Sequence, residues 1–341
     1  MTDPPDRTIR IGARTSPLAR AQADQVAAAL QARGWATEFV GITTTGDVDQ
    51  RSLTQIGGTG VFVGAVREAL YDRRIDVAVH SLKDLPTGPA VELQVSAVPA
   101  REDTRDVLIG RTLATLRDGD RIGTGSPRRA IQLAELGDRL GVDLEVVEVR
   151  GNVDTRIAHV AEGRVSAVLL AAAGLRRLGH LELEDSHSSD DDSPTNVQGL
   201  TAHILSARDM VPAPGQGALA LEIHQSLSRP AAAAVRSLDD RAAHAESLAE
   251  RAFLARLEAG CTAPVGARAV LTGVRGRDLD LTMRVVIGRT LLSNLSESTN
   301  TTSPLRRTLT GTLVDPRQFG EEAAASMLDE LRTPQRARHA Q

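Results

Sequence analysis

Asp84 and Lys83 are the residues whose types and setting point most directly to chemistry. They follow a β-branched stretch, residues 75–80, in the sequence Ser81-Leu-Lys-Asp-Leu-Pro86. A lone carboxylate among cations is expected to keep its negative charge. Asp84 could therefore stabilise a cation formed in a reaction, or shuttle a proton. A simple salt bridge between Asp84 and Lys83 fits the sequence equally well.

Lys83 is the only lysine among 40 Lys and Arg residues. Exposed positions tolerate either cation, so this ammonium indicates a place that needs a compact point charge. Chance survival is the alternative.

Cations recur where predicted strands end. In an open α/β sheet, ligands bind beyond the carboxyl ends of the strands. Helices predicted to begin after Ser16 and Ser126 add free N–H donors and partial positive charge. The pattern predicts a cleft for several carboxylates or phosphates, although many arginines in so Arg-rich a chain could simply be solvated. The cations concerned are Arg14, Lys83, Arg128, Arg129, Arg150, Arg156, Arg176 and Arg177.

Cys261 lies between Gly260 and Pro264, in a predicted loop exposed enough for covalent modification. A lone cysteine is more often a small buried hydrophobe. One cysteine and eight scattered histidines give no metal-ligand spacing, so no metal site is expected. A single cysteine also excludes an internal disulfide and fits a reducing cytoplasm.

Strands and helices alternate along the chain, which predicts an α/β protein with parallel sheets. A length of 341 residues indicates two or three domains. A strand within residues 210–222 is expected to return to the first sheet, and residues 184–199 are expected to form a solvated acidic loop. The predicted domains are residues 1–102 plus 207–224, residues 103–206, and residues 225–341.

Composition narrows the function. The net charge is −4 and aromatic residues make up 2% of the chain, which argues against nucleic-acid binding. No apolar run approaches the roughly 18 residues that span a bilayer. The acidic N-terminus does not resemble a secretory signal, so a cytoplasmic protein without membrane contact is expected. No exposed apolar stripe demands a partner, so a monomer is expected.

Taken together, these segments resemble the porphobilinogen deaminase (hydroxymethylbilane synthase) family, and they are collinear over nearly the whole chain. The matching stretches are Arg14-Thr-Ser-Pro-Leu-Ala19, Thr45-Gly-Asp47, Ile56-Gly-Gly-Thr-Gly-Val-Phe62, Asp76-Val-Ala-Val-His-Ser-Leu-Lys-Asp-Leu-Pro86, Arg101-Glu-Asp103, Gly123-Thr-Gly-Ser-Pro-Arg-Arg129, Arg150-Gly-Asn-Val-Asp-Thr-Arg156, Ala173-Gly-Leu-Arg-Arg-Leu-Gly179, Pro214-Gly-Gln-Gly-Ala218 and Glu258-Ala-Gly-Cys261.

The resemblance implies three domains, the first two like the lobes of a type II periplasmic binding protein and the third a small α/β domain. It implies a dipyrromethane cofactor joined to Cys261 by a thioether. It also implies that four porphobilinogen molecules are condensed with loss of ammonia, and that water releases linear hydroxymethylbilane. Asp84 would be the catalytic carboxylate. The acetate and propionate groups would be bound by Arg14, Ser16, Lys83, Thr124, Ser126, Arg128, Arg129, Arg150, Arg156 and Arg177.

Chemistry read from the residues agrees with this assignment. Each pyrrole unit carries two carboxylates, which the planar fork of arginine suits. A thiolate is nucleophilic enough to form the covalent anchor. The chain departs from the family at Gln55, Thr59 and Gly64, where lysines are common in a glycine-rich loop. A non-catalytic two-lobed protein that binds a carboxylate is the alternative, and it would need neither Cys261 nor a cofactor.

Overall fold

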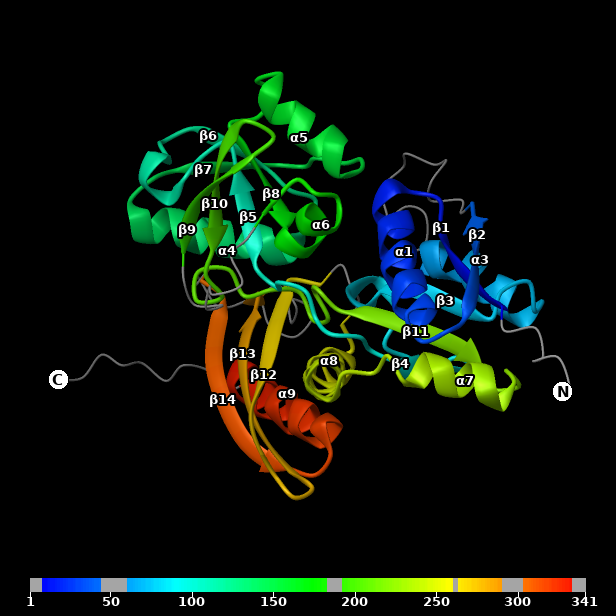
Figure 1. The fold of residues 1–341 in the computed structure, drawn as a ribbon. Helices are drawn as coiled ribbons and strands as arrows, with labels where there is room; N and C mark the ends of the chain where they lie inside the picture. Colours follow the sequence, from blue (N-terminus) through cyan, green and yellow to red (C-terminus); the bar gives the residue numbers. More distant parts are fainter. Residues whose placement is uncertain (1–7, 44–59, 183–191, 260–262, 290–302, 333–341) are drawn as a thin grey trace, which may run out of the picture.

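The structure is a computed structural model that describes residues 8–43, 60–182, 192–259, 263–289 and 303–332. Cys261, Gln55 and Thr59 lie outside these ranges. The described residues form three β-sheets with helices packed on them (Figure 1). The predicted α/β class with three sheet-bearing parts is confirmed.

Sheet A has the strand order β2-β1-β3-β11-β4. Its strands are β1 (Thr8–Arg14), β2 (Ala36–Ile42), β3 (Val77–Ser81), β4 (Leu93–Ala97) and β11 (Leu219–His224). Its helices are α1 (Pro17–Gln31), α3 (Gly60–Tyr71) and α7 (Arg229–Arg236), and the 3-10 helix η1 (Leu82–Asp84) follows β3. β11 pairs antiparallel with both β3 and β4, so the predicted return of this strand to the first sheet is confirmed.

Local sequence explains β1 and α1. Ile9 and Ile11 alternate along β1 and are buried in the core of sheet A. The side chain of Ser16 caps α1 by accepting a hydrogen bond from the backbone N–H of Ala19, and Pro17 occupies the first turn. The carboxyl end of β1 therefore leads directly into a helix N-terminus.

Sheet B has the order β7-β6-β8-β5-β10-β9. Its strands are β5 (Asp106–Ile109), β6 (Asp120–Gly123), β7 (Leu144–Val147), β8 (Ala167–Ala171), β9 (Ser193–Val197) and β10 (Leu200–Leu205). Its helices are α4 (Pro127–Leu140), α5 (Val153–Ala161) and α6 (Ala172–Arg177), with the 3-10 helix η2 (Leu113–Thr115).

Two expectations about these sheets were wrong. Sheets A and B are mixed rather than parallel, because β11 in sheet A and β5 and β10 in sheet B pair antiparallel with their neighbours. Part of the segment 184–199 expected to be a loop is strand β9, which pairs with β10 at the edge of sheet B. Pro194 is compatible with this strand because an edge leaves one side of the backbone unpaired.

Sheet C is an antiparallel meander of β12 (Val265–Arg275), β13 (Asp278–Ile287) and β14 (Leu305–Leu313). Helices α8 (Arg241–Arg256) and α9 (Pro316–Arg332) cover one of its faces (Figure 1). Phe253, Met283 and Phe319 lie in the core between the helices and the sheet.

Helix α7 belongs with sheet A by its packing. Ala231 and Val235 share a buried cluster with Ile11 and Leu221. We therefore propose that the third domain begins after α7 rather than at residue 225; the other predicted boundaries stay predictions. Among the helices that the structure describes, none combines the length and apolar character of a bilayer span.

Gly320 sets the approach of α9 to α8. A Cβ atom at this position would lie 2.1 Å from the carbonyl oxygen of Ala249. We expect Gly320→Ala to push the two helices apart and to lower the free energy of unfolding by about 1–3 kcal/mol. Gly64→Ala is the matched control, because nothing lies within 4 Å of its Cβ position in helix α3. It should leave stability unchanged or raise it by up to about 1 kcal/mol. Urea unfolding followed by circular dichroism would measure both, and equal midpoints for the two variants would contradict this packing.

Candidate functional site

The predicted cations do lie at the carboxyl ends of strands. In sheet A, Arg14 is the last residue of β1, and Lys83 and Asp84 lie in η1 directly after β3. β1 and β3 are parallel neighbours, so these ends share one edge of the sheet. In sheet B, three further groups follow β6, β7 and β8: the pair Arg128 and Arg129, then Arg150 and Arg156, then Arg176 and Arg177.

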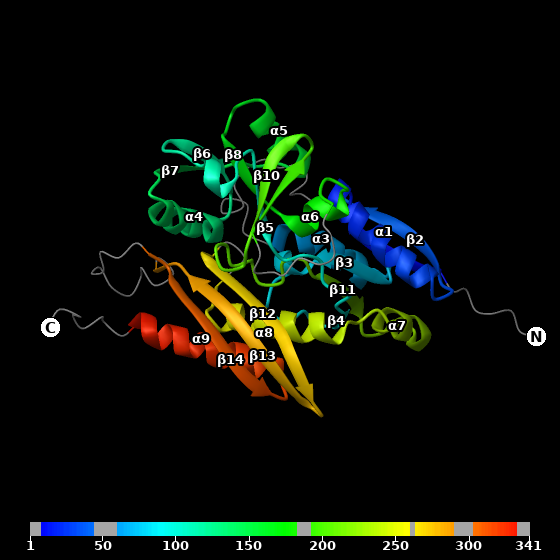
Figure 2. The ribbon, with the colours of Figure 1, turned by 60° about the vertical axis from the view of Figure 1, so that its left-hand side comes forward.

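The two sheet edges approach one another. Helix α6 of sheet B lies beside α1 of sheet A (Figure 2). Lys83 is close enough to Arg128, Arg129 and Asp106 for each to act on its pKa. The negative charge of Asp84, in sheet A, likewise acts on the pKa of Arg156, in sheet B. Lys83, Arg128, Arg129 and Arg156 therefore lie in one region, and its role as a binding cleft stays a prediction.

Residues of the third domain also line this region. A small cavity of about 30 Å³ is lined by Lys83, Ser126 and Arg128 together with Leu254 and Ala263. Ser126 precedes α4 but makes no side-chain capping bond, so its hydroxyl is available to a ligand. Residues of all three domains thus meet at one point.

Asp106, at the start of β5, organises the cations of sheet B. Its side chain is fully buried, and Arg129 Nη2 donates to Oδ1 at 2.7 Å. Arg128 Nη1 lies 2.8 Å from Oδ2 and donates to the carbonyl of Val211. Gln216 Nε2 donates to Oδ1 at 3.0 Å. Burial alone would raise the pKa of Asp106, but the two guanidiniums outweigh it and hold this pKa well below its usual range.

Two crossing segments join the lobes: residues 98–105, between β4 and β5, and residues 206–218, between β10 and β11. Gln216 and Glu250 hold these segments together. Gln216 Nε2 also donates to the carbonyl of Thr104 at 2.7 Å. The carboxylate of Glu250, from α8, is fully buried and accepts from both Nη atoms of Arg101 at 2.8 Å. It also accepts from the backbone N–H of Gly215 at 2.7 Å. The third domain therefore holds both segments through one carboxylate.

Three cations near the junction, the place where residues of the three domains meet, have lowered pKa values. Burial lowers the pKa of Lys83, and the nearby Arg129 and Arg128 lower it further. Burial also lowers the pKa of Arg156, with Arg129 and Arg150 adding to the effect. Burial lowers the pKa of Arg177 to about 10, against the opposing charge of Glu102. Each shift marks a cation that an additional anion would stabilise.

Unused donors point to the same conclusion. The Nε atoms of Arg128, Arg129 and Arg177 are buried, and none of them donates a hydrogen bond to any described residue. A buried donor without an acceptor costs about 1–3 kcal/mol. The donor set therefore fits a ligand with several carboxylates, such as the dipyrromethane that the sequence resemblance implies.

The remaining predicted residues are placed as follows. Thr124 is buried, and its hydroxyl accepts from the backbone N–H of Ser126 at 3.2 Å, which shapes the turn before α4. Arg150 is exposed and pairs with Glu148. Asp84 is exposed, and the alternative of a salt bridge between Lys83 and Asp84 is not found within 4 Å in the described part of the chain. Cys261 lies outside the described residues, so its place in the site is untested.

Sequence reasoning missed Asp106, Gln216 and Glu250. Gln216 lies within the stretch Pro214–Ala218, and Asp106 lies three residues after the stretch that ends at Asp103. Their local sequence does not indicate which residues they contact. Within the described ranges, no group of three or more His, Cys, Asp or Glu side chains is arranged to hold a metal ion.

Comparison with known proteins gives two family matches. Residues 9–231 match "Porphobilinogen deaminase, dipyromethane cofactor binding domain" and residues 244–329 match "Porphobilinogen deaminase, C-terminal domain". The chain is 45% identical over 327 residues to porphobilinogen deaminase 1 of Streptomyces coelicolor, covering 95% of each chain. It is 47% identical over 270 residues to porphobilinogen deaminase of Leifsonia xyli subsp. xyli, covering 77% of this chain and 76% of that one.

Two solved structures illustrate more distant similarity. The methionine binding protein MetQ aligns with a TM-score of 0.40 at 10% identity, covering 68% of this chain and 90% of that chain. A periplasmic substrate-binding protein of an ABC transporter from Coxiella burnetii aligns with a TM-score of 0.37 at 15% identity, covering 67% and 91%. No argument rests on similarities of this size.

Asp106→Asn tests the organising role of this carboxylate. The change leaves two buried guanidiniums without their anion, so we expect the free energy of unfolding to fall by about 3–5 kcal/mol at pH 7. Because the pKa of Asp106 is lowered from 3.8 on folding, its contribution is complete above about pH 4 and is lost as the pH falls further. Urea unfolding from pH 3 to pH 8 measures the difference. Asp138→Asn, at an exposed site in α4, should have no effect; a similar loss in both variants would rule out the special role of Asp106.

Proposed function

This chain belongs to the porphobilinogen deaminase family, and on that premise we propose that it is a hydroxymethylbilane synthase. The reaction is the stepwise head-to-tail condensation of four porphobilinogen molecules with loss of ammonia, followed by hydrolytic release of linear hydroxymethylbilane. The observation that carries the proposal is the set of buried Nε donors of Arg128, Arg129 and Arg177, which have no acceptor among the described residues. Substrate and product carry several carboxylates, which these donors suit.

The cofactor implied by the family fits this junction. Lys83, Ser126, Arg128 and Arg129 are the residues nearest the meeting point that would hold its carboxylates. When bound, dipyrromethane supplies the electron-rich pyrrole from which the product chain is extended. Arg14, Ser16, Thr124, Arg150, Arg156 and Arg177 line the same two sheet edges and would bind the remaining acetate and propionate groups.

Cys261 is proposed as the attachment point. Ala263, two residues further along, lines the small cavity with Lys83 and Ser126. Two residues span at most about 7 Å of chain. The position of Ala263 therefore supports a thioether reaching the cationic junction, which a non-catalytic carboxylate-binding protein would not need.

Asp84 is proposed as the catalytic carboxylate. It is exposed, and it lies close enough to Lys83 and Arg156 for its charge to act on their pKa values. Loss of ammonia from porphobilinogen leaves an electron-poor cation, and an ionised carboxylate can stabilise that charge. The same group can hold the proton that the departing amine takes up. The guanidiniums around it hold the carboxylates of the substrate and so orient the reacting carbon.

We extend the proposal to a monomer that works in the cytoplasm on a small molecule, without nucleic-acid or membrane partners. The support is compositional: the net charge is −4 and the chain has one cysteine.

Intact mass tests the covalent cofactor. The purified protein should exceed its sequence mass by one dipyrromethane and should give a positive Ehrlich reaction for pyrroles. Cys261→Ala should remove both signals, because the thiol that makes the bond is gone. If wild type has the bare sequence mass and converts no porphobilinogen, the carboxylate-binding alternative is preferred.

Asp84→Ala tests the carboxylate. We expect turnover of porphobilinogen to fall by about 10²–10⁴-fold, the usual contribution of a positioned acid or charge, while the cofactor stays attached by mass. Asp72→Ala is the matched control, since Asp72 is an exposed carboxylate that pairs with Arg74 after α3. Unchanged turnover in Asp84→Ala would remove this residue from the mechanism.

A further inference from the structure

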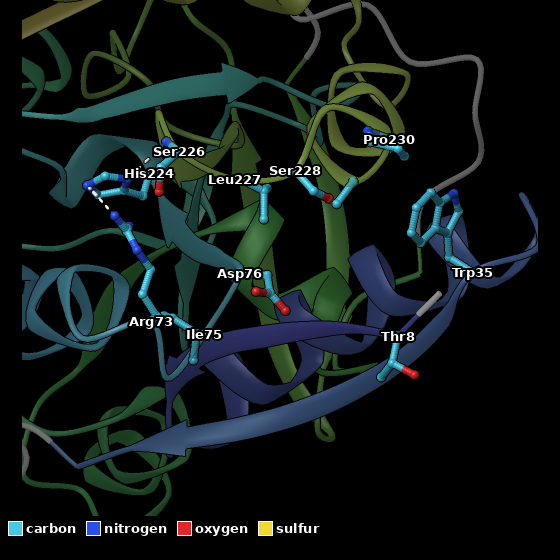
Figure 3. Close-up of a pocket in the computed structure, with 11 residues that line it drawn as sticks. Thr8, Trp35, Arg73, Ile75, Asp76, His224, Ser226, Leu227, Ser228 and Pro230 are labelled. Carbon is cyan, nitrogen blue, oxygen red and sulfur yellow. Dashed lines mark hydrogen bonds between the residues drawn. The ribbon is translucent and has the colours of Figure 1, made fainter. Parts of the chain in front are cut away.

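A cavity of about 540 Å³ opens at the edge of sheet A opposite to the strand-end cations (Figure 3). It is lined by Thr8, the first residue of β1, and by Ile75 and Asp76, which precede β3. The seven residues of β1 separate the two sheet edges by about 20 Å. The cavity is therefore distinct from the site of the proposed function, which makes no use of it.

One end of the cavity holds the side chains of Arg73 and His224 in contact. Nη2 of Arg73 lies 3.0 Å from Nε2 of His224 (Figure 3). The backbone N–H of Ser226 lies 3.0 Å from the other ring nitrogen, Nδ1. A guanidinium and a backbone N–H can only donate, whereas a neutral imidazole accepts at one ring nitrogen only. The imidazole therefore cannot accept from both, and this end of the cavity has one donor more than the acceptors of these groups.

Arg73 is the cation at this end among the described lining residues. Asp76 is the acidic residue among the described lining residues, and its carboxylate accepts from Nε and Nη2 of Arg10 at 3.0 and 2.8 Å and from the backbone N–H of Arg10 at 2.9 Å. No carboxylate of the described residues pairs with Arg73. Glu92 is the rival acceptor: its Oε2 is 3.6 Å from Nε2 of His224, and its side chain is 52% exposed.

The other end of the cavity is apolar. Figure 3 shows Trp35 and Pro230 there, away from the Arg73–His224 pair. The flat indole ring of Trp35 offers a surface for stacking. An occupant that used both ends would join an oxyanion to an aromatic body.

We propose that this cavity binds an elongated organic anion, with a carboxylate or sulfonate bound at the end that holds Arg73 and His224 and an aromatic body directed toward Trp35. A bare inorganic anion would leave the apolar end unused. A neutral aromatic molecule would leave the guanidinium of Arg73 without an anion.

Trp35 makes the proposal measurable, because it is the only tryptophan in the chain. The probe is 8-anilinonaphthalene-1-sulfonate, and energy transfer from indole emission to the bound dye reports binding near Trp35. We expect saturable transfer with the wild-type protein. N-phenyl-1-naphthylamine, which has the same rings without the sulfonate, should bind at least tenfold more weakly.

Three variants separate this cavity from other dye sites. Arg73→Gln should raise the Kd of the sulfonate dye at least tenfold, because a charge-assisted hydrogen bond is lost. Arg74→Gln should leave the Kd unchanged, since Arg74 is an exposed neighbour that pairs with Asp72 and does not line the cavity. Glu92→Gln should lower the Kd, because it removes the rival carboxylate charge while keeping the side-chain shape.

Several results would overturn the proposal: no saturable transfer, equal Kd values for the charged and neutral dyes, or an unchanged Kd in Arg73→Gln. Circular dichroism confirms that each variant is folded. Turnover of porphobilinogen should be unchanged in Arg73→Gln, so failure of this inference and failure of the proposed function can be told apart.

Discussion

A buried carboxylate bound by two guanidiniums and an amide is the interaction on which the rest of the structure depends. Asp106 stands where the first crossing segment enters sheet B, and it is fully buried. Removing such a charge from water is costly, and only close, well-directed partners offset the cost. Arg128 and Arg129 supply the charge, and Gln216 supplies a hydrogen bond from the second crossing segment. The carboxylate of Asp106 thus orients Arg128 and Arg129 and also binds the second crossing segment through Gln216.

This constraint bears on the proposed role of the arginines in ligand binding. A free arginine has many rotamers, and ordering it on binding costs entropy. Arg128 and Arg129 have already lost that freedom, because each is bound to Asp106 and to a backbone carbonyl. Their Nε atoms remain unused in the described structure. The conformational entropy of these two side chains is therefore lost when the protein folds. A bound anion would not have to offset that loss again.

Much of the fold follows from local sequence. The alternation of strands and helices, the cap at Ser16 and the placing of cations after strand ends were all predicted and are confirmed. Strand direction was wrong, because it depends on partners far away in the chain, as for β11 between β3 and β4. β9 was assigned to a loop because Ser193-Pro-Thr-Asn-Val197 has little of the pattern of a buried strand.

The site was only partly predictable for the same reason. Lys83, Arg128 and Arg129 could be found from their positions after strands. The importance of Gln216 could not, since its hydrogen bond to Asp106 joins residues 110 positions apart. Glu250 is similar: it lies on a helix of ordinary composition, and its bond to Arg101 spans 149 positions. Cys261 was singled out by its flanking glycine and by the family resemblance, and it lies outside the described residues.

The position of β11 also orders events during synthesis on the ribosome. β11, residues 219–224, fills the place between β3 and β4, so the first sheet has a gap until about two thirds of the chain has emerged. All six strands of sheet B lie between residues 106 and 205, and they are complete before β11 appears. Domains tend to fold as units as they leave the ribosome. The second lobe is thus free to form first, while β3 and β4 each lack a neighbouring strand until β11 has been synthesised.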